Sequence, residues 1–118
     1  MCNQMVSQTE LSDAEVDRIF RALADQTRRD IMRRVLTDEA AVSELAAVYD
    51  MSFAAVQKHV TVLEEAGLVT KHPRGRQRIV RGEPDRIRRA QLLLAQYEDI
   101  WRVRIGRLDA LLDESKGI

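Results

Sequence analysis

Residues 42–69, VSELAAVYDMSFAAVQKHVTVLEEAGLV, decide the fold of this chain. Apolar side chains recur at helical spacing within residues 43–49 and again at Val56, Val60 and Leu63. A short break lies between the two runs, and Ser52 at its end is a residue type that caps helix starts. The stretch therefore predicts two short helices joined by a tight turn, with Gly67 ending the second helix.

The outer face of the second predicted helix carries candidate DNA contacts. Because Val56, Val60 and Leu63 point inward, the opposite face projects into solvent. A helix of this width fits the major groove, where glutamine pairs with adenine and an apolar side chain can contact the thymine methyl group. The expected contact residues are Ser52, Phe53, Ala54, Gln57, Lys58 and Thr61.

After Gly67 the period changes from helical to extended. Two short β-like runs, residues 68–72 and 77–80, flank Pro73-Arg74-Gly75-Arg76, which predicts a hairpin turn. Residues 68–81 carry five bases and no acid: Lys71, Arg74, Arg76, Arg78 and Arg81. We expect Arg74, Arg76 and Arg78 to contact DNA, chiefly its phosphates, and the alternative is a solvated edge.

Two helices are predicted before this region. Ser12 followed by Glu15 has the spacing of a capping box, and Asp25 is placed to cap a second helix. In the short third helix, Ser43 is the expected cap. One face of the second helix carries Arg28, Arg29, Arg33 and Arg34, which could bind phosphate or pair with nearby acids.

A last helix is predicted from residue 84 to about residue 114, roughly 45 Å long. Ile87, Leu94, Trp101 and Leu108 recur in it at every seventh position. This stripe could be core alone. A three-helix domain is too small to cover such a helix, however, so the stripe predicts an interface.

The order of elements predicts a mainly α fold with a small β-hairpin wing, a winged helix-turn-helix with a long C-terminal dimerisation helix. The 118 residues fit one domain, in which residues 12–83 are the expected DNA-binding core and residues 84–114 the dimerisation helix. The net charge is zero, but acids gather in residues 10–17 and bases in residues 68–81. A neutral chain can thus present one basic edge.

Three segments together resemble the ArsR (arsenic-repressor-like) family of bacterial and archaeal winged-helix repressors. ALADQTRRDIMRRVL, residues 22–36, is similar to the family's second helix, and MSFAAVQKHVTVLEEAGLV, residues 51–69, to its recognition helix. PRGRQRIVR, residues 73–81, resembles its arginine-rich wing. The resemblance spans about residues 16–81 and implies a homodimeric repressor on an inverted-repeat operator in double-stranded DNA.

The resemblance also implies a dimer contact between the first and last helices. The expected interface residues are Val16, Phe20, Leu94, Tyr97, Trp101, Ile105 and Leu108. The chain departs from the family at Asp50, where a glycine is common, and at Phe53, Ala54 and Gln57 on the reading face. These departures leave the operator sequence open.

Metal sensing is not expected. Founding family members bind metals through cysteines on the helix before the turn, and here residues 44–49 contain neither Cys nor His. The only thiol and imidazoles in the chain are Cys2, His59 and His72, too few for a zinc or soft-metal site. We expect no cofactor, an incidental thiol at Cys2, a hydrogen-bonded His59, and a His72 that touches phosphate or solvent.

Other functions fit the sequence less well than DNA binding. An enzyme is not expected, because no nucleophile with an oriented base and no glycine-rich phosphate loop is visible. The main alternative is a protein-interaction module that uses the long helix and binds DNA weakly or not at all. No apolar run approaches the ~20 residues that span a bilayer, and no secretory pattern is seen, so a cytoplasmic location without a membrane partner is expected.

Overall fold

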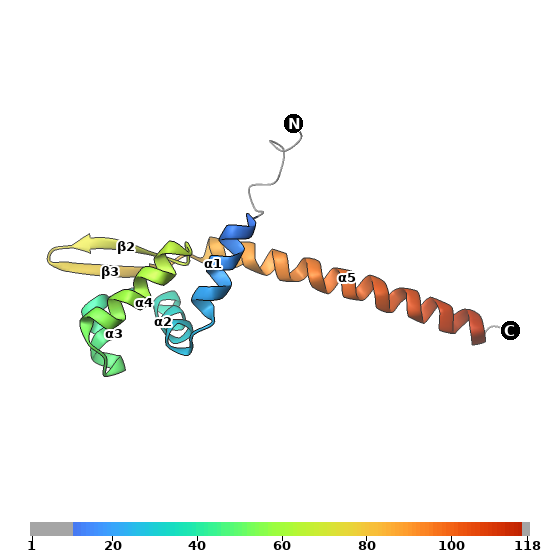
Figure 1. Ribbon diagram of the computed structural model, residues 1–118, viewed down its shortest axis with the longest axis horizontal. Coiled ribbons are helices and arrows are strands. Elements are labelled where there is room, and N and C mark those ends of the chain that lie inside the picture. The colour runs from blue at the N-terminus through green and yellow to red at the C-terminus, as the bar shows by residue number, and fades with distance from the viewer. Residues whose placement is uncertain (1–10, 117–118) are drawn as a thin grey trace, which may run out of the picture.

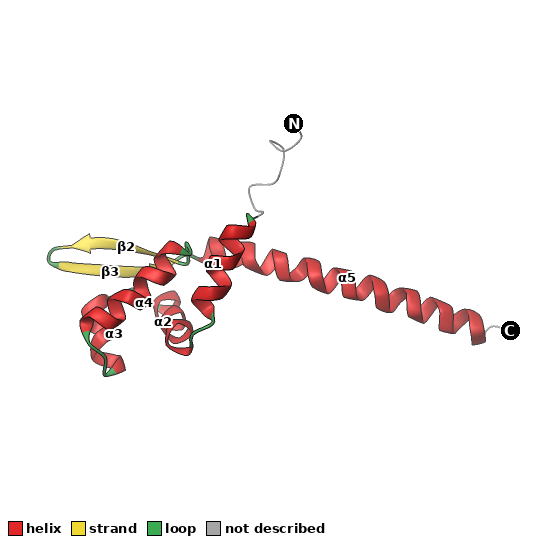
Figure 2. Ribbon diagram, viewed as in Figure 1, coloured by secondary structure: helices red, strands yellow, loops and turns green. Residues whose placement is uncertain are grey.

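The computed structural model describes residues 11–116, which form five helices and three short strands. Four shorter helices and the sheet gather into a small body, and a long helix projects away from it, giving overall extents of 74 × 40 × 21 Å (Figure 1). Figure 2 shows how little of the chain is loop. The elements are α1 (Asp13–Leu23), α2 (Gln26–Thr37), β1 (Ala40–Ala41), α3 (Val42–Tyr49), α4 (Phe53–Glu65), β2 (Val69–Arg74), β3 (Gln77–Gly82) and α5 (Pro84–Lys116).

Three of the predicted helix caps are confirmed. Ser12 Oγ accepts a hydrogen bond from the Glu15 backbone N–H at 3.1 Å, and Glu15 Oε1 accepts one from the Ser12 N–H at 2.8 Å. The Asp25 carboxylate accepts a hydrogen bond from the Arg28 backbone N–H, and the Ser52 hydroxyl accepts one from the Ala55 N–H, each at 3.1 Å. These side chains fix where α1, α2 and α4 begin.

The predicted cap of α3 was wrong. The helix begins at Val42, one residue before Ser43, and its N-cap is Ala41. Glu44 Oε1 accepts the Ala41 N–H at 2.7 Å, which satisfies a backbone donor at the start of the helix. The reason for the shift is β1: Ala41 is held in an extended conformation opposite Ile79, so the chain enters the helix directly from the strand.

The tight turn of the helix-turn-helix lies where it was predicted. α3 ends at Tyr49, and Asp50 adopts a left-handed conformation with φ 50°. Aspartate is one of the few non-glycine residues that visits this region. Gly67, with φ 77°, ends α4 in a Schellman motif, in which the Leu68 N–H donates to Leu63 O at 3.0 Å. The end of α3 and both ends of α4 are therefore set by local chemistry visible in the sequence.

The sheet is larger than predicted. It has three antiparallel strands in the order β1-β3-β2, and not the two strands of a simple hairpin. The turn is also shorter than the predicted residues 73–76, because Pro73 and Arg74 belong to β2 and only Gly75 and Arg76 connect the strands. Pro73 is tolerated because β2 is an edge strand. A positive φ at Gly75 but not at Arg76 is the pattern of a type II′ turn.

One core packs the body together. Its buried residues come from α1 to α4, from the connection after α4 and from the sheet: Ile19, Ala22, Ile31, Met32, Val35, Val42, Leu45, Val56, Val60, Leu63, Ala66, Leu68, Val69 and Val80. Leu36, the last apolar residue of α2, is outside this core and is 46% exposed. It lies in the last turn of the helix, where the chain leaves toward β1.

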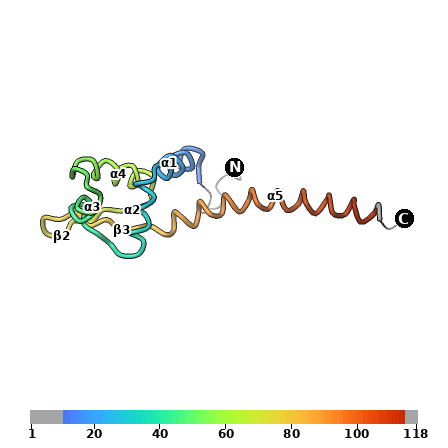
Figure 3. The backbone as a smooth tube through the Cα atoms, turned by 90° about the horizontal axis from the view of Figure 1, so that it is seen from below, coloured from blue at the N-terminus to red at the C-terminus, as the bar shows by residue number. Residues whose placement is uncertain are grey.

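Most of α5 leaves the core. Ile87 and Ala90 pack against it, and beyond them the helix runs on alone, as the view in Figure 3 also shows. The core-only explanation of the apolar stripe is therefore wrong after Ala90. Nine large apolar residues of α5 are exposed: Leu92, Leu94, Tyr97, Ile100, Trp101, Val103, Leu108, Leu111 and Leu112. Within residues 11–116, no helix is long and apolar enough to cross a membrane.

Candidate DNA-binding surface

The predicted reading face of α4 is largely solvent-accessible. Phe53 is 54% exposed, and Ala54 and Lys58 are exposed beside it. Gln57 and Thr61 are half-buried. Ser52 is exposed, but its hydroxyl oxygen already serves the helix cap. Ser52 caps α4 and Phe53 begins it, three residues before the buried Val56, whereas Ala54, Gln57, Lys58 and Thr61 lie on the faces of the helix turned away from Val56 and Val60.

The wing is not free of acids in space. Glu39, in the segment between α2 and β1, bridges two arginines: its Oε2 lies 2.7 Å from Arg74 Nη2 and its Oε1 lies 2.9 Å from Arg81 Nε. These bonds, that of Arg74 first, hold the pKa of Glu39 below its usual value. Sequence reasoning missed this carboxylate because the β1–β3 pairing, which carries it to the wing, has no signal in two alanines.

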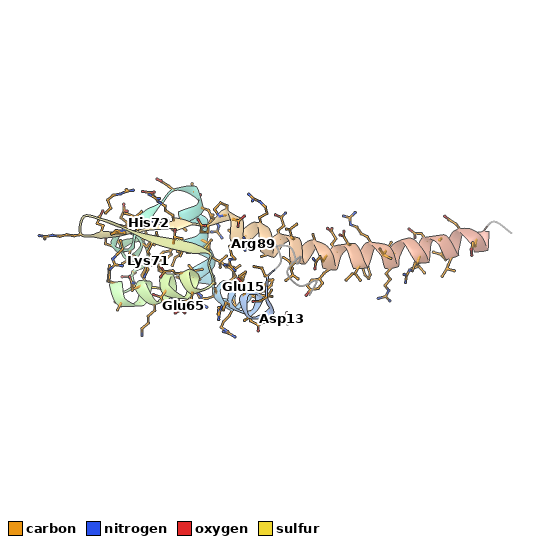
Figure 4. The ribbon with its side chains drawn as sticks, turned by 90° about the horizontal axis from the view of Figure 1, so that it is seen from above. Asp13, Glu15, Glu65, Lys71, His72 and Arg89 are labelled. Atoms are coloured by element: carbon orange, nitrogen blue, oxygen red, sulfur yellow. The ribbon has the colours of Figure 1, made fainter. Side chains whose placement is uncertain are left out.

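Lys71 is neutralised in the same way. Its Nζ lies 3.3 Å from Glu64 Oε1, which ties β2 to α4. Figure 4 shows Lys71 and its neighbour His72 on the hairpin, on the side of the body away from the projecting helix. His72 Nε2 lies 2.9 Å from Thr70 Oγ1 within the same strand, so the imidazole makes a local hydrogen bond.

Two wing arginines remain for an external anion. Arg76, in the tip of the hairpin, and Arg78 are exposed, and neither forms an ion pair with any residue in 11–116. Arginine without an internal carboxylate is free to place its guanidinium fork on phosphate. Of the five basic residues predicted to form this edge, these two are the ones without an ion pair in residues 11–116.

The arginines of α2 make contacts within the chain: Arg33 and Arg34 pair with Asp30 at 2.9 and 3.0 Å, as one of the two predicted explanations has it, whereas Arg28 and Arg29 bond other groups. Arg28 Nε donates to Ala22 O at 2.7 Å, and its Nη1 donates to His59 Nδ1 at 3.3 Å. Arg29 Nη1 donates to Leu23 O at 2.8 Å. These contacts satisfy carbonyls at the end of α1 and confirm that His59 is hydrogen-bonded.

A polar cluster fixes the end of α3 against α2. The Tyr49 hydroxyl donates to Asp30 Oδ2, and Arg34 Nε donates to the same oxygen at 3.0 Å. The tyrosine bond, followed by the Arg34 bond, lowers the pKa of Asp30, while burial and the bond to Asp30 raise the pKa of Tyr49 to about 12. The Arg34 guanidinium also lies 5.4 Å from the centre of the Tyr49 ring. This cluster positions the turn that precedes α4.

The part of the chain that the structure describes offers no ready metal site. Within 11–116, no group of three or more His, Cys, Asp or Glu side chains is placed to hold a metal ion. Cys2 lies outside the described residues, so its expected role as an incidental thiol stays a prediction.

Known proteins share this sequence and architecture. A family described as a helix-turn-helix domain matches residues 18–72. The HTH-type transcriptional regulator Rv2034 of Mycobacterium tuberculosis is 43% identical over 68 residues, which make up 58% of this chain and 64% of that protein. The chain thus spans less than two thirds of that relative. The uncharacterized HTH-type transcriptional regulator YuzN of Bacillus subtilis is 42% identical over 71 residues, 54% of this chain and 77% of that protein.

The fold has been seen in a solved relative. The crystal structure of an ArsR family transcriptional regulator is 33% identical, covers 79% of this chain and 96% of its own, and superposes with a TM-score of 0.73. Both the helix-turn-helix and the wing predicted from residues 42–81 are present in the structure. The chain belongs to the ArsR family of winged helix-turn-helix transcriptional regulators.

Proposed function

We propose that this protein is a homodimeric repressor that binds an inverted-repeat operator in double-stranded DNA. The observation that carries the proposal is one surface of the body. On it, the outer face of α4 is exposed, and the neighbouring hairpin holds Arg76 and Arg78 without acidic partners in residues 11–116. A helix held this way enters the major groove while the wing contacts the backbone.

The side chains of α4 suit different parts of the duplex. Gln57 can pair bidentately with adenine, and the exposed ring of Phe53 is suited to a thymine methyl group. Lys58 carries a compact ammonium group, and Arg76 and Arg78 carry planar guanidinium groups. Both kinds of cation are suited to phosphate. Ser52, Ala54 and Thr61 are the remaining proposed contacts of this surface. Sequence specificity is thus assigned to Gln57 and Phe53, and affinity for DNA to the basic side chains of Lys58, Arg76 and Arg78.

Dimerisation is assigned to α1 and α5. Phe20 on α1 is 42% exposed, and on α5 Leu94, Tyr97, Trp101 and Leu108 are each at least half exposed. Exposed apolar patches of this kind mark protein interfaces. Val16 and Ile105 are half-buried on the same two helices. Two copies related by a two-fold axis would present two recognition helices to an inverted repeat.

Binding is proposed to need no transition metal, since the helix before the turn lacks thiolates and imidazoles. A chelator and added zinc should both leave the affinity for DNA unchanged. A large shift in the affinity for DNA with either would contradict this part of the proposal.

The alternative function, a protein-interaction module, is favoured instead if no duplex, random or selected, is bound at moderate salt.

The proposal is tested by selecting bound duplexes from a random pool, footprinting the selected site and placing it before a reporter gene. An inverted repeat whose occupancy lowers reporter output is expected. Selected sites without an inverted repeat would contradict the proposed operator, and raised reporter output would contradict repression.

Sedimentation tests the dimer: Leu94→Asp should dissociate it, because a charge enters an apolar contact. Val103→Asp, at an equally exposed position outside the stripe, is the matched control.

A further inference from the structure

One side chain, that of Arg28, connects three helices. Arg28 belongs to the first turn of α2, where its backbone N–H donates to the capping carboxylate of Asp25. Its Nε and Nη2 donate to two carbonyls in the last turn of α1, Ala22 O at 2.7 Å and Arg21 O at 3.1 Å. Its Nη1 donates to Nδ1 of His59, in the middle of α4, at 3.3 Å. The guanidinium of Arg28 therefore joins the end of α1 to the middle of α4.

These bonds restrict α1 and α4 more strictly than the apolar contacts between the two helices do. α1 lies beside α4 (Figure 1), and two of its residues, Ile19 and Ala22, are fully buried in the core. Apolar contact has no preferred direction, whereas the donors of a planar guanidinium point in fixed directions. A guanidinium can only donate, so the His59 Nδ1 is the acceptor of this bond. The placement of α4 relative to α1 thus depends on a specific acceptor atom.

A second arginine joins the same two helices at their other ends. Arg86, at the start of α5, donates to Glu15 in the first turn of α1 and lies against Gly67, two residues after α4. Along α1, Glu15 and Ala22 are about 10 Å apart, and the part of α4 that follows His59 is about 9 Å long. A single point of attachment would let one helix swing about the other. Two points roughly 10 Å apart fix its direction.

The two helices have different tasks in the proposed function. α1 belongs to the proposed dimer contact, and α4 is the proposed reading helix. The angle between them therefore sets how far each α4 lies from the two-fold axis, and symmetry applies any change in both copies. One base pair of spacing moves the half-sites by about 3.4 Å and rotates them by about 35°. A displacement of about 1.7 Å in each copy thus matters as much as a whole base pair.

We propose that Arg28, through its bond to His59, is a positioning residue that fixes α4 relative to α1 and so sets the half-site spacing that the protein accepts. The proposal rests on the homodimer and the inverted repeat proposed above, and it adds the residue that determines their spacing. Arg28 itself contacts no DNA in this arrangement. Without its bonds, the reading of one half-site should be intact, and the spacing between two half-sites should be less strictly selected.

The neighbouring Arg29 provides a matched control. Its Nη1 donates to Leu23 O at 2.8 Å, so it also bonds a carbonyl at the end of α1. Among the described residues, no hydrogen bond joins Arg29 to α4. Arg29→Met therefore removes a bond of the same kind as Arg28→Met does, but leaves the connection between α1 and α4 in place.

A series of DNA duplexes tests the proposal. One duplex carries two selected half-sites at the selected spacing, two others have one base pair added or removed between them, and a fourth carries a single half-site. The unmodified protein should bind the selected spacing most tightly. Arg28→Met should lower this preference about tenfold, because one charge-assisted hydrogen bond contributes enough free energy for such a change. Its affinity for the single half-site should be unchanged, and Arg29→Met should keep the preference.

Two substitutions of His59 separate the bond from the stability of the helix. Asparagine and leucine have nearly the same shape, but only asparagine carries an acceptor close to the position of Nδ1. His59→Asn should therefore keep the spacing preference, and His59→Leu should lower it as Arg28→Met does. Leucine is the better helix former, so a loss of helix stability alone would give the opposite order. This pair also decides the question if circular dichroism shows that Arg28→Met is unfolded.

The outcomes separate this proposal from the function on which it rests. If the unmodified protein prefers no spacing, the inverted repeat proposed above is contradicted, and the role of Arg28 with it. If the unmodified protein prefers one spacing and His59→Leu keeps that preference, the role of Arg28 is overturned while the proposed function stands. Equal losses in His59→Asn and His59→Leu, or in Arg29→Met and Arg28→Met, would overturn it as well.

Discussion

Arg86 Nη1 donates a hydrogen bond of 2.8 Å to Glu15 Oε2, which joins the start of α5 to the first turn of α1. The same guanidinium lies over the backbone of Gly67, where a Cβ would come within 2.7 Å of Arg86 Nε. The Arg86 side chain of α5 therefore contacts both the start of α1 and the glycine that ends α4. Together with the packing of Ile87 and Ala90 against the core, this contact joins the long helix to the body.

Glu15→Gln should make the protein less stable at neutral pH and nearly as stable as the unmodified protein at pH 2. The backbone N–H of Ser12, followed by Arg86, lowers the pKa of Glu15 from 4.5 to about 2. A lowered pKa stabilises the fold above the unfolded value, so this contribution is lost as the pH falls from about 4.5 to 2. Because Glu15 is 34% exposed, we expect only about 1 kcal/mol.

Urea unfolding of both proteins at a series of pH values measures this difference. Glu65→Gln, which changes an exposed acid without an ion-pair partner in residues 11–116, is the control for loss of charge alone. A difference between Glu15→Gln and the unmodified protein that does not change with pH would contradict the assignment.

Gly67→Ala should destabilise the protein more than Gly75→Ala. Both glycines have positive φ, 77° and 64°, so each substitution costs about 1 kcal/mol for the left-handed conformation. Only at position 67 does the new methyl group also meet Arg86, while position 75 is open. Thermal unfolding should show an additional loss of stability at 67 that Arg86→Ala partly relieves. Equal losses at the two positions would show that Arg86 moves aside freely.

The sequence predicted the parts of this structure that local chemistry controls. Ser12, Asp25, Ser52 and Gly67 set helix ends through bonds within a few residues, so their roles could be inferred without knowing the fold. The exposure of Trp101 followed from the length of α5 against the size of the body.

The features that were missed depend on long-range pairing. The two alanines of β1 have no strand pattern, and they form a strand only because β3 is presented to them about 40 residues later in the chain. The same pairing carries Glu39 to Arg74 and Arg81. Similarly, nothing near Arg28 indicates that it bonds carbonyls of α1 and the ring of His59. The position of the candidate surface could therefore be predicted from the sequence. Which of its charged side chains are held in ion pairs could not.

Arg74→Ala and Arg78→Ala should differ in the salt dependence of DNA binding. Arg74 is held by Glu39 at 2.7 Å, and we expect it to position the wing, whereas Arg78 should contact phosphate. Removing one phosphate contact makes the slope of log K against log salt shallower by about 0.9. Arg78→Ala should show that change once for each copy in the dimer and Arg74→Ala little of it, while Glu39→Gln should steepen the slope by releasing two arginines in each copy. Equal slope changes in both arginine variants would contradict the role given to Glu39.

The most direct test of the proposed function compares Gln57→Ala and Arg76→Ala in salt titrations on the selected operator and on random duplexes. Gln57→Ala should cost about 1–3 kcal/mol on the operator and much less on random DNA, because Gln57 is assigned to a base edge. Arg76→Ala should weaken both alike and make the salt slope shallower by about one unit for each phosphate that Arg76 neutralises. The reverse pattern, in which Gln57→Ala weakens both duplexes equally and Arg76→Ala removes only the operator preference, would contradict these roles.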